Sequence, residues 1–211
     1  MMIKDTATII EKLKRMHGDP RCELEFSNPL ELTIATILSA QCTDERVNRV
    51  TKNLFKKYRT MDDYLTVPIE ELQEDIKPTG FYKNKAKIIK NVVSEIKDRF
   101  SGKLPEDIDT LATIKGIGRK SANMIIGCAY HKPAVIVDTH FSRVSNRIGI
   151  TELKDPQKIE DDIKRKVPQN HWLDLSLLLI LHGRYVCKAK KPECSKCELK
   201  EDCNFFVKGV R

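Results

Sequence analysis

The chain has 211 residues, of which 38 are Lys or Arg and 30 are Asp or Glu, so its formal net charge is +8. This length suffices for one large or two small domains with real cores, and the positive charge favours a polyanionic partner. No stretch approaches the roughly 18 consecutive apolar residues of a membrane-spanning helix, and residues 1–5 lack the apolar centre of a signal peptide. We therefore expect a soluble, intracellular protein that does not bind membranes.

Apolar residues at helical spacing predict a succession of helices along the chain. The second is the most apolar of the early ones and is expected to be central; it starts at Asn28 and Pro29, a capping side chain followed by proline in the first turn. The expected helical segments are residues 6–17, 28–38, 44–55, two short pieces within 61–78, a long helix ending at 100, a helix starting at 104–107, and segments ending near 131, 148, 167 and 186.

The apolar run at residues 134–137 could be read as a short strand. Because the chain offers no partner strand, we predict a buried extended connector and an all-α protein. Asp138 follows this run and precedes a helical pattern, so we expect its carboxylate to cap that helix.

Two glycines at the centre of the chain form the most informative local motif, K-G-I-G-R-K at residues 115–120. Helical patterns on either side place Gly116 and Gly118 in a tight hairpin between two helices. Glycine lets backbone N–H groups approach a phosphate oxygen closely, and the start of the second helix adds to the attraction. We therefore predict a phosphate site at the hairpin, with Lys115 as a further cation. Arg119 and Lys120 begin the second helix beside the phosphate, and the motif leaves open which of the two has a role beyond neutralising charge.

Four of the seven cysteines crowd the end of the chain with the spacing C-x6-C-x2-C-x5-C. In a reducing compartment this clustering indicates a metal site rather than disulfides. Tetrahedral zinc and a cubane iron–sulfur cluster both fit four thiolates, and the spacing alone does not choose between them. The predicted ligands are Cys187, Cys194, Cys197 and Cys203. Lys190 and Lys191 lie in the first loop, where a metal would fix the backbone that presents them to phosphates.

Five segments occur in the order L-S-A-Q-C-T-D, G-F-Y-K-N-K-A, K-G-I-G-R-K, V-D-T-H and the cysteine array. Together they resemble the endonuclease III branch of the helix-hairpin-helix, Gly/Pro-Asp superfamily of DNA glycosylases, over nearly the whole chain. The resemblance implies an all-helical, two-lobed fold with the active site in a cleft between the lobes. A six-helix lobe with the hairpin would span residues 22–133, and residues 1–21 and 134–211 would form the lobe with a [4Fe–4S] cluster loop.

The same resemblance implies roles for individual residues. Lys120 would be the nucleophile and Asp138 would assist it, while the four cysteines would hold a [4Fe–4S] cluster. Gln41 would reach into the gap left by an extruded base, and Phe81 would wedge into the opposite strand. Without the resemblance, Gln41 reads as part of a solvated loop and Phe81 as a loop aromatic packed on the core. The family's hairpin usually reads L-P-G-V-G, and this chain has Lys115 where proline is commonest.

The implied function is base-excision DNA repair by a bifunctional DNA N-glycosylase and AP lyase. Such an enzyme removes oxidised pyrimidines through a lysine Schiff base and cuts 3′ to the abasic site by β-elimination. We expect a cytoplasmic monomer, in the pool around a prokaryotic nucleoid, that binds double-stranded DNA with damaged pyrimidines or abasic sites. Two alternatives stay open: a monofunctional mismatch glycosylase of the same superfamily, which typically lacks lysine at position 120, and a non-catalytic iron–sulfur DNA-binding module.

Overall fold

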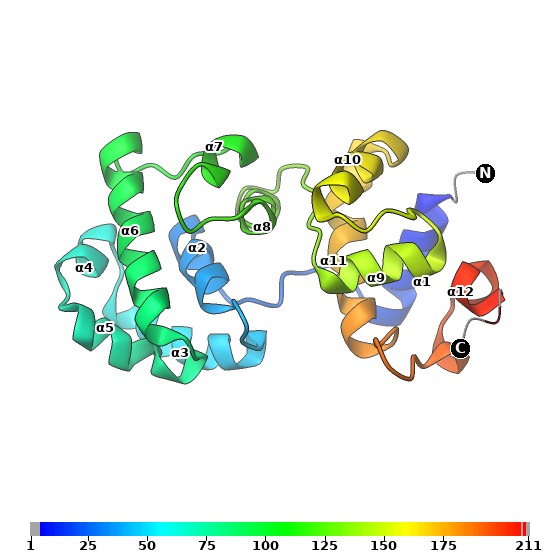
Figure 1. The fold of residues 1–211 in the computed structure, drawn as a ribbon, viewed down its shortest axis with the longest axis horizontal. Coiled ribbons are helices and arrows are strands. Elements are labelled where there is room, and N and C mark those ends of the chain that lie inside the picture. Colours follow the sequence, from blue (N-terminus) through cyan, green and yellow to red (C-terminus); the bar gives the residue numbers. More distant parts are fainter. Residues whose placement is uncertain (1–4, 208, 210–211) are drawn as a thin grey trace. The chain divides into compact units, whose positions relative to one another are not determined.

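The computed structural model describes residues 5–207 and 209 of the chain. Every regular element among these residues is a helix, which confirms the predicted all-α class. The chain divides into two units, residues 22–131 and residues 1–21 together with 132–211, which we call the central unit and the terminal unit (Figure 1). The expectation that the chain starts without a signal peptide was based on residues 1–5, and residues 1–4 lie outside the described residues.

The central unit is built around α2, as its apolar sequence predicts. Residues 32–38 are all buried, and the helix packs against α8, α3 and α6. Asn28 caps its first turn by accepting a hydrogen bond from the Glu31 N–H at 3.0 Å, and Pro29 occupies the first helical position. The elements of this unit are α2 (Pro29–Leu38), α3 (Asp44–Lys57), α4 (Met61–Thr66), α5 (Ile69–Ile76), η1 (Lys77–Thr79), α6 (Tyr82–Phe100), α7 (Ile108–Ala112) and α8 (Arg119–Tyr130).

The terminal unit is built around the apolar helix α11, whose residues 175–183 are all buried. This helix packs on α9 and α1, which confirms the prediction of a buried core helix. No helix in the described part of the chain combines the length and the apolar character that a membrane crossing requires. The elements of this unit are α1 (Thr6–His17), α9 (Thr139–Ile148), α10 (Pro156–Lys166), η2 (Gln169–His171), α11 (Trp172–Tyr185), η3 (Cys194–Lys196), η4 (Lys200–Asp202) and α12 (Asn204–Val207).

Residues 134–137 form the buried extended connector that the sequence predicts. All four side chains are buried, and none belongs to a helix or strand. The Ile136 N–H donates a hydrogen bond to Ser176 Oγ on α11 at 3.0 Å, which satisfies a buried backbone group where no sheet is available. The connector therefore delivers Asp138 to the start of α9 from a fixed position.

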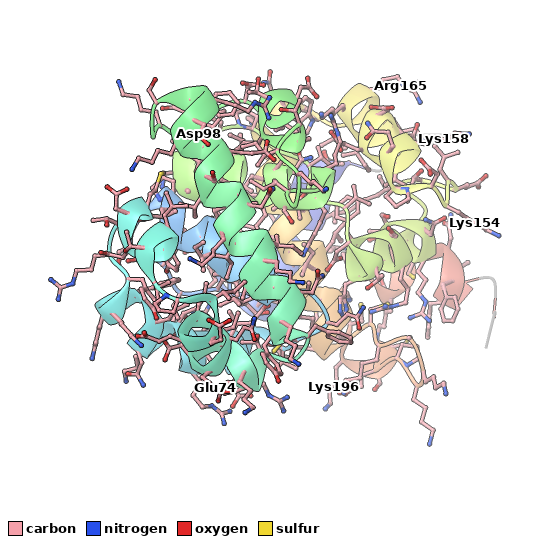
Figure 2. All side chains as sticks on the ribbon, turned by 60° about the vertical axis from the view of Figure 1, so that its left-hand side comes forward. Glu74, Asp98, Lys154, Lys158, Arg165 and Lys196 are labelled. Atoms are coloured by element: carbon pink, nitrogen blue, oxygen red, sulfur yellow. The ribbon has the colours of Figure 1, made fainter. Side chains whose placement is uncertain are left out.

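Charged side chains cover the outside of the helices in both units. Glu74 and Asp98 of the central unit and Lys158 of the terminal unit are exposed and project away from their ribbons (Figure 2). The helix expected to start at residues 104–107 is α7, which is capped by Asp107 and has only five residues. The four-residue helix α12 was not predicted, because an element of about one helical turn carries no periodic pattern.

Candidate functional site

The hairpin between α7 and α8 is held against α6 by its own backbone. The Lys115 N–H donates to Glu95 Oε1 at 3.2 Å, and Asn91 Nδ2 donates to the Lys115 carbonyl at 2.8 Å. Gly116 has φ +118°, and a Cβ on it would lie 2.7 Å from Cγ2 of Ile88. The first glycine is therefore required by the protein's own packing, because no side chain fits between the turn and α6.

The second glycine is free of such contacts. Gly118 caps α8 without a side-chain hydrogen bond, and a Cβ on it would have no atom within 4 Å. Gly118 therefore places no capping side chain of its own at the start of α8, an arrangement that suits anion binding. Lys120 is exposed in this first turn and makes no ion pair with any described residue, whereas Arg119 pairs with Asp109 at 2.5 Å. A phosphate would have to compete with Asp109 for Arg119.

Five non-glycine residues in the described part of the chain have positive φ: Gln41, Phe81, Ser101, His131 and Lys191. Ser101 and His131 are the residues that end α6 and α8, a common place for this conformation. The other three are all positions that the sequence assigned to DNA contact. A left-handed non-glycine residue costs on the order of 1–3 kcal/mol and is found preferentially at functional sites.

The exposure of Gln41 and Phe81 agrees with their assignment to DNA contact. Gln41 is exposed in the turn between α2 and α3, and the Phe81 side chain is 65% exposed just before α6. An aromatic ring packed on the core would be buried, so the structure excludes that alternative for Phe81.

Asp138 lies in the terminal unit as the cap of α9. Its Oδ1 accepts a hydrogen bond from the Phe141 N–H at 2.7 Å, which confirms the predicted capping role. No hydrogen bond from the described residues reaches Oδ2. One carboxylate oxygen is therefore anchored while the other remains available.

The four cysteines of the array line one cavity, whose other walls include Ile148, Pro192, Phe205 and Phe206. All four are free thiols, and burial raises the pKa of Cys194 and raises that of Cys197 to about 11. Without a cation, Cys194 and Cys197 are therefore protonated at neutral pH. Among the described residues, no three His, Cys, Asp or Glu side chains are placed to hold one metal ion. The thiols thus surround a shared space rather than converge on a point.

Two arginines of α9 organise the first loop of this array, and the sequence did not single them out. Arg147 donates to the carbonyls of Lys188 and Ala189 at 2.8 and 3.0 Å and to Cys187 Sγ at 3.3 Å. Arg143 Nε donates to the Cys187 carbonyl at 3.1 Å. Within the same loop, the Lys188 ammonium forms an ion pair with Glu193 at 2.7 Å. The spacing of the arginines by four positions on one helix is the only sequence signal that could have indicated a shared partner.

A pair of histidines reaches the same array from α1 and α11. His182 Nε2 lies 3.4 Å from Cys197 Sγ, and its Nδ1 lies 3.0 Å from His17 Nε2. Burial lowers the pKa of His182 to about 4, so its ring is neutral at pH 7 and carries a single N–H. Lys190 and Lys191 are exposed beyond these contacts, and neither has an ion pair within the described residues.

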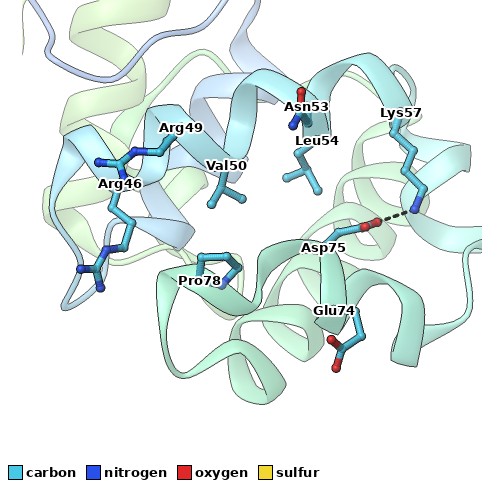
Figure 3. A pocket seen from close by; sticks show the side chains of 9 residues that line it. All are labelled: Arg46, Arg49, Val50, Asn53, Leu54, Lys57, Glu74, Asp75 and Pro78. Carbon is cyan, nitrogen blue, oxygen red and sulfur yellow. Dashed lines mark hydrogen bonds and ion pairs between the residues drawn. The ribbon is translucent and has the colours of Figure 1, made fainter.

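A separate groove lies between α3 and the α5–η1 segment of the central unit (Figure 3). Arg46 and Arg49 lie at one end of it, and at the other Lys57 pairs with Asp75 at 2.6 Å. None of the residues that the sequence assigned to a function lines this groove. It is therefore not part of the candidate site.

Comparisons with known proteins agree on one family. Residues 34–169 match the family model described as HhH-GPD superfamily base excision DNA repair protein. The chain is 46% identical over 202 residues to endonuclease III of Bacillus subtilis, covering 95% of this chain and 92% of that protein. It is 36% identical over 200 residues to endonuclease III of Escherichia coli, covering 95% of each.

Solved structures give the same result. A non-covalent endonuclease III–DNA complex matches with a TM-score of 0.92 at 40% identity, covering 100% of this chain and 99% of that chain. A trapped endonuclease III–DNA covalent intermediate matches with the same TM-score and identity and full coverage of both chains. A thermostable thymine-DNA glycosylase shares the fold with a TM-score of 0.86 at 22% identity, covering 96% of each chain.

Proposed function

The chain belongs to the endonuclease III family of bifunctional DNA glycosylase/AP lyases, and we propose that Lys120 and Asp138 carry this activity on oxidised pyrimidines and abasic sites in double-stranded DNA. Family membership makes the protein a base-excision-repair enzyme, so the expected enzyme class is confirmed. It also sets aside the alternative of a non-catalytic binding module. A lysine at position 120 favours the bifunctional reaction over hydrolysis by a monofunctional relative.

Lys120 acts as the nucleophile in this proposal. Its deprotonated amine attacks C1′ of the extruded nucleotide, and the bond to the base breaks as the new C–N bond forms. The base leaves with the bonding electrons and takes up a proton, and the sugar ring opens to a Schiff base. Loss of a proton from C2′ then expels the 3′ phosphate, which cuts the strand on the 3′ side. Two observations support this role: Lys120 is exposed, and it forms no ion pair with any residue that the structure describes.

Asp138 assists by electrostatics and position. The hydrogen bond from the Phe141 N–H fixes one of its oxygens, so the carboxylate does not have to be ordered when the reaction begins. The other oxygen can stabilise positive charge that develops on the sugar as the base departs. Capping and catalysis are thus compatible in one side chain.

DNA recognition uses three parts of the central unit. Phosphates bind at Gly118, which has no side chain to obstruct their approach to the start of α8, with Lys115, Gly116 and Arg119 shaping or charging the turn. Gln41 and Phe81 enter the duplex when the damaged base is extruded, a step that costs least when the base is already poorly paired. The left-handed backbone of both residues supports this role, since such strain persists only where the surrounding structure enforces it.

The cysteine array would hold a [4Fe–4S] cluster through Cys187, Cys194, Cys197 and Cys203. The residues present fit such a group, because four sulfurs share one cavity. Cys187 Sγ accepts a hydrogen bond from Arg147, and Cys197 Sγ lies 3.4 Å from His182 Nε2. When bound, the cluster cross-links the loop and is capable of one-electron transfer. The loop then presents Lys190 and Lys191 to the DNA backbone.

We place this activity in a monomer in the cytoplasm, around the nucleoid where the substrate lies.

One observation carries the proposal: an exposed lysine that forms no ion pair with any described residue, in the first turn of a helix whose cap residue, Gly118, supplies no side-chain hydrogen bond. The test is a panel of labelled duplexes with oxidised pyrimidines, oxidised purines, mismatches and abasic sites, scored separately for base release and strand cleavage. Release and cleavage should be strongest for oxidised pyrimidines. Equal or stronger release of mismatched bases, without cleavage, would contradict the proposal.

Asp138→Asn sharpens the test, because Asp155 caps α10 in the same way through the Lys158 N–H at 2.9 Å. We expect Asp138→Asn to slow base release by about 10²-fold or more, while Asp155→Asn leaves the rate within about twofold of the wild type. Equal rates for the two variants would reduce Asp138 to a helix cap.

A further inference from the structure

A buried lysine in the central unit has no part in the chemistry described above. Only 3% of Lys85 is exposed, although it belongs to the first turn and a half of α6. Its Nζ donates hydrogen bonds to the carbonyls of Leu38 and Thr79, both at 2.8 Å. A single ammonium therefore joins two backbone segments that lie 41 positions apart in the sequence.

Each of these carbonyls stands at the base of a loop that carries a proposed insertion residue. Leu38 is the last residue of α2, and Gln41 follows in the turn toward α3. Thr79 is the last residue of η1, and Phe81 follows after Gly80. Lys85 itself lies one helical turn after Phe81, and its N–H donates a hydrogen bond to the Phe81 carbonyl at 3.0 Å. The ammonium thus links the start of both loops.

Keeping a cation at this position has a cost. Burial lowers the pKa of Lys85, because it disfavours the charged form of the amine. An apolar side chain would fill the space without desolvating a charge. What the ammonium adds is two directed bonds to carbonyls, one of them at the C-terminal end of a helix, where a cation is favoured. The gain lies in fixing the geometry of the two carbonyls.

We propose that Lys85 is a positioning residue that holds the Gln41 and Phe81 loops at a fixed separation, so that both enter the duplex at the same base pair. The inference rests on the proposed function, because it assumes that these two loops act in base extrusion. Without the ammonium, each loop keeps its insertion residue, but the separation between the two loops is no longer fixed.

The chain offers a matched control on the same helix. Lys90 Nζ donates to the carbonyls of Leu65 and Val67 at 2.9 and 2.6 Å. Both carbonyls lie at the C-terminal end of α4, so Lys90 ties α6 to that end by the same chemistry, at a place where no residue is assigned to DNA. Lys90→Met removes a comparable pair of bonds without touching either insertion loop.

The experiment measures single-turnover base release by wild type, Lys85→Met and Lys90→Met from two duplexes, one with the lesion in a regular pair and one with the lesion opposite a mismatched base. Because misplacement of a positioned group by about 1 Å can cost about 10²-fold, we expect Lys85→Met to slow release from the regular pair by about tenfold to a hundredfold. The loss should be several times smaller for the mismatched duplex, where extrusion costs less. Lys90→Met should leave the rates of base release from both duplexes within about twofold of the wild-type rates.

A loss that is equal on the two duplexes, or equal to that of Lys90→Met, would overturn the inference. Gln41→Ala and Phe81→Ala separate this failure from failure of the proposed function. If these variants leave the ratio of the two rates at the wild-type value, the insertion roles themselves are wrong. If they shift the ratio and Lys85→Met does not, only the role of Lys85 is wrong. Should Lys85→Met fail to fold, Lys85→Gln keeps a neutral amide donor group in place of the ammonium and should show the same shift to a smaller degree.

Discussion

Two loops of this enzyme are proposed to present cations to DNA, and they are held in place by different means. The hairpin at residues 113–118 buries Ile114 and Ile117 and packs Gly116 against α6. In the cysteine loop at residues 187–203, only Leu199 and Cys203 are buried. The hairpin is therefore shaped by ordinary side-chain packing, whereas the cysteine loop is held by hydrogen bonds from α9 and, in the proposed function, by a cluster on its four thiols.

The largest expected effect comes from removing one ligand of the cysteine loop. Cys197→Ser should lose bound iron, and residues 187–203 should then lose protection from hydrogen exchange, because the loop has almost no core of its own. The helices α2, α6 and α8 of the central unit should keep their protection. Iron content and regional hydrogen exchange measured by mass spectrometry check both statements.

Cys42→Ser is the control for this experiment, since Cys42 is a half-buried free thiol outside the array. It should keep full iron content and loop protection. An iron-free Cys197→Ser protein with a fully protected loop would show that the two loops are held alike.

The two glycines of the hairpin provide the next test. Gly116→Ala combines a left-handed φ with a Cβ 2.7 Å from Ile88, so the free energy of unfolding should fall by about 2–4 kcal/mol. Gly118→Ala has open space around its Cβ and should change stability by less than about 0.5 kcal/mol. It should weaken binding to abasic-site duplex instead, because its methyl group occupies the space of a phosphate oxygen. Denaturant unfolding and DNA titration separate the two effects, and similar stabilities for the two variants would disprove the division of roles.

A smaller effect on the free energy of unfolding is expected from changing Asp162 in α10, which belongs to the helical part of the terminal unit. This part should be stable independently of the cysteine loop. Burial acts to raise the pKa of Asp162, but hydrogen bonds from Lys166, Thr151 and Arg165 outweigh it and hold the pKa below its usual 3.8. The unfolded chain then binds a proton more readily than the folded one, so this contribution to stability is present above pH 3.8 and is lost as the pH falls below it.

Asp162→Asn should therefore lower the free energy of unfolding by about 1–3 kcal/mol near neutral pH, and the difference from wild type should shrink in acid. The neighbouring Asp161 is exposed, and Asp161→Asn should change little at either pH. Equal pH profiles for the two variants would contradict the stated role of the Asp162 hydrogen bonds.

The sequence predicted those features that depend on neighbours along the chain. Asn28, Pro29 and Asp138 lie where helices begin, and their capping chemistry is local, so the structure confirms them. The connector at residues 134–137 was predictable because a lone apolar run without a partner strand has few ways to satisfy its backbone.

Contacts between distant segments escaped prediction. Lys85, Arg147 and His182 reach partners 47, 41 and 15 residues away. The first two bond to backbone carbonyls, which every residue possesses and which leave no mark in the sequence. The left-handed backbone of Gln41 and Phe81 was equally hidden, since neither residue type favours it.

The most direct test of the account is borohydride reduction of the protein on an abasic-site duplex, comparing wild type with Lys120→Ala and with Lys115→Ala, which removes the other exposed lysine of the hairpin. Only a Schiff base is reduced to a stable covalent adduct. We predict an adduct for wild type and for Lys115→Ala, and none for Lys120→Ala. An undiminished adduct in Lys120→Ala would show that another amine is the nucleophile and would contradict the central claim.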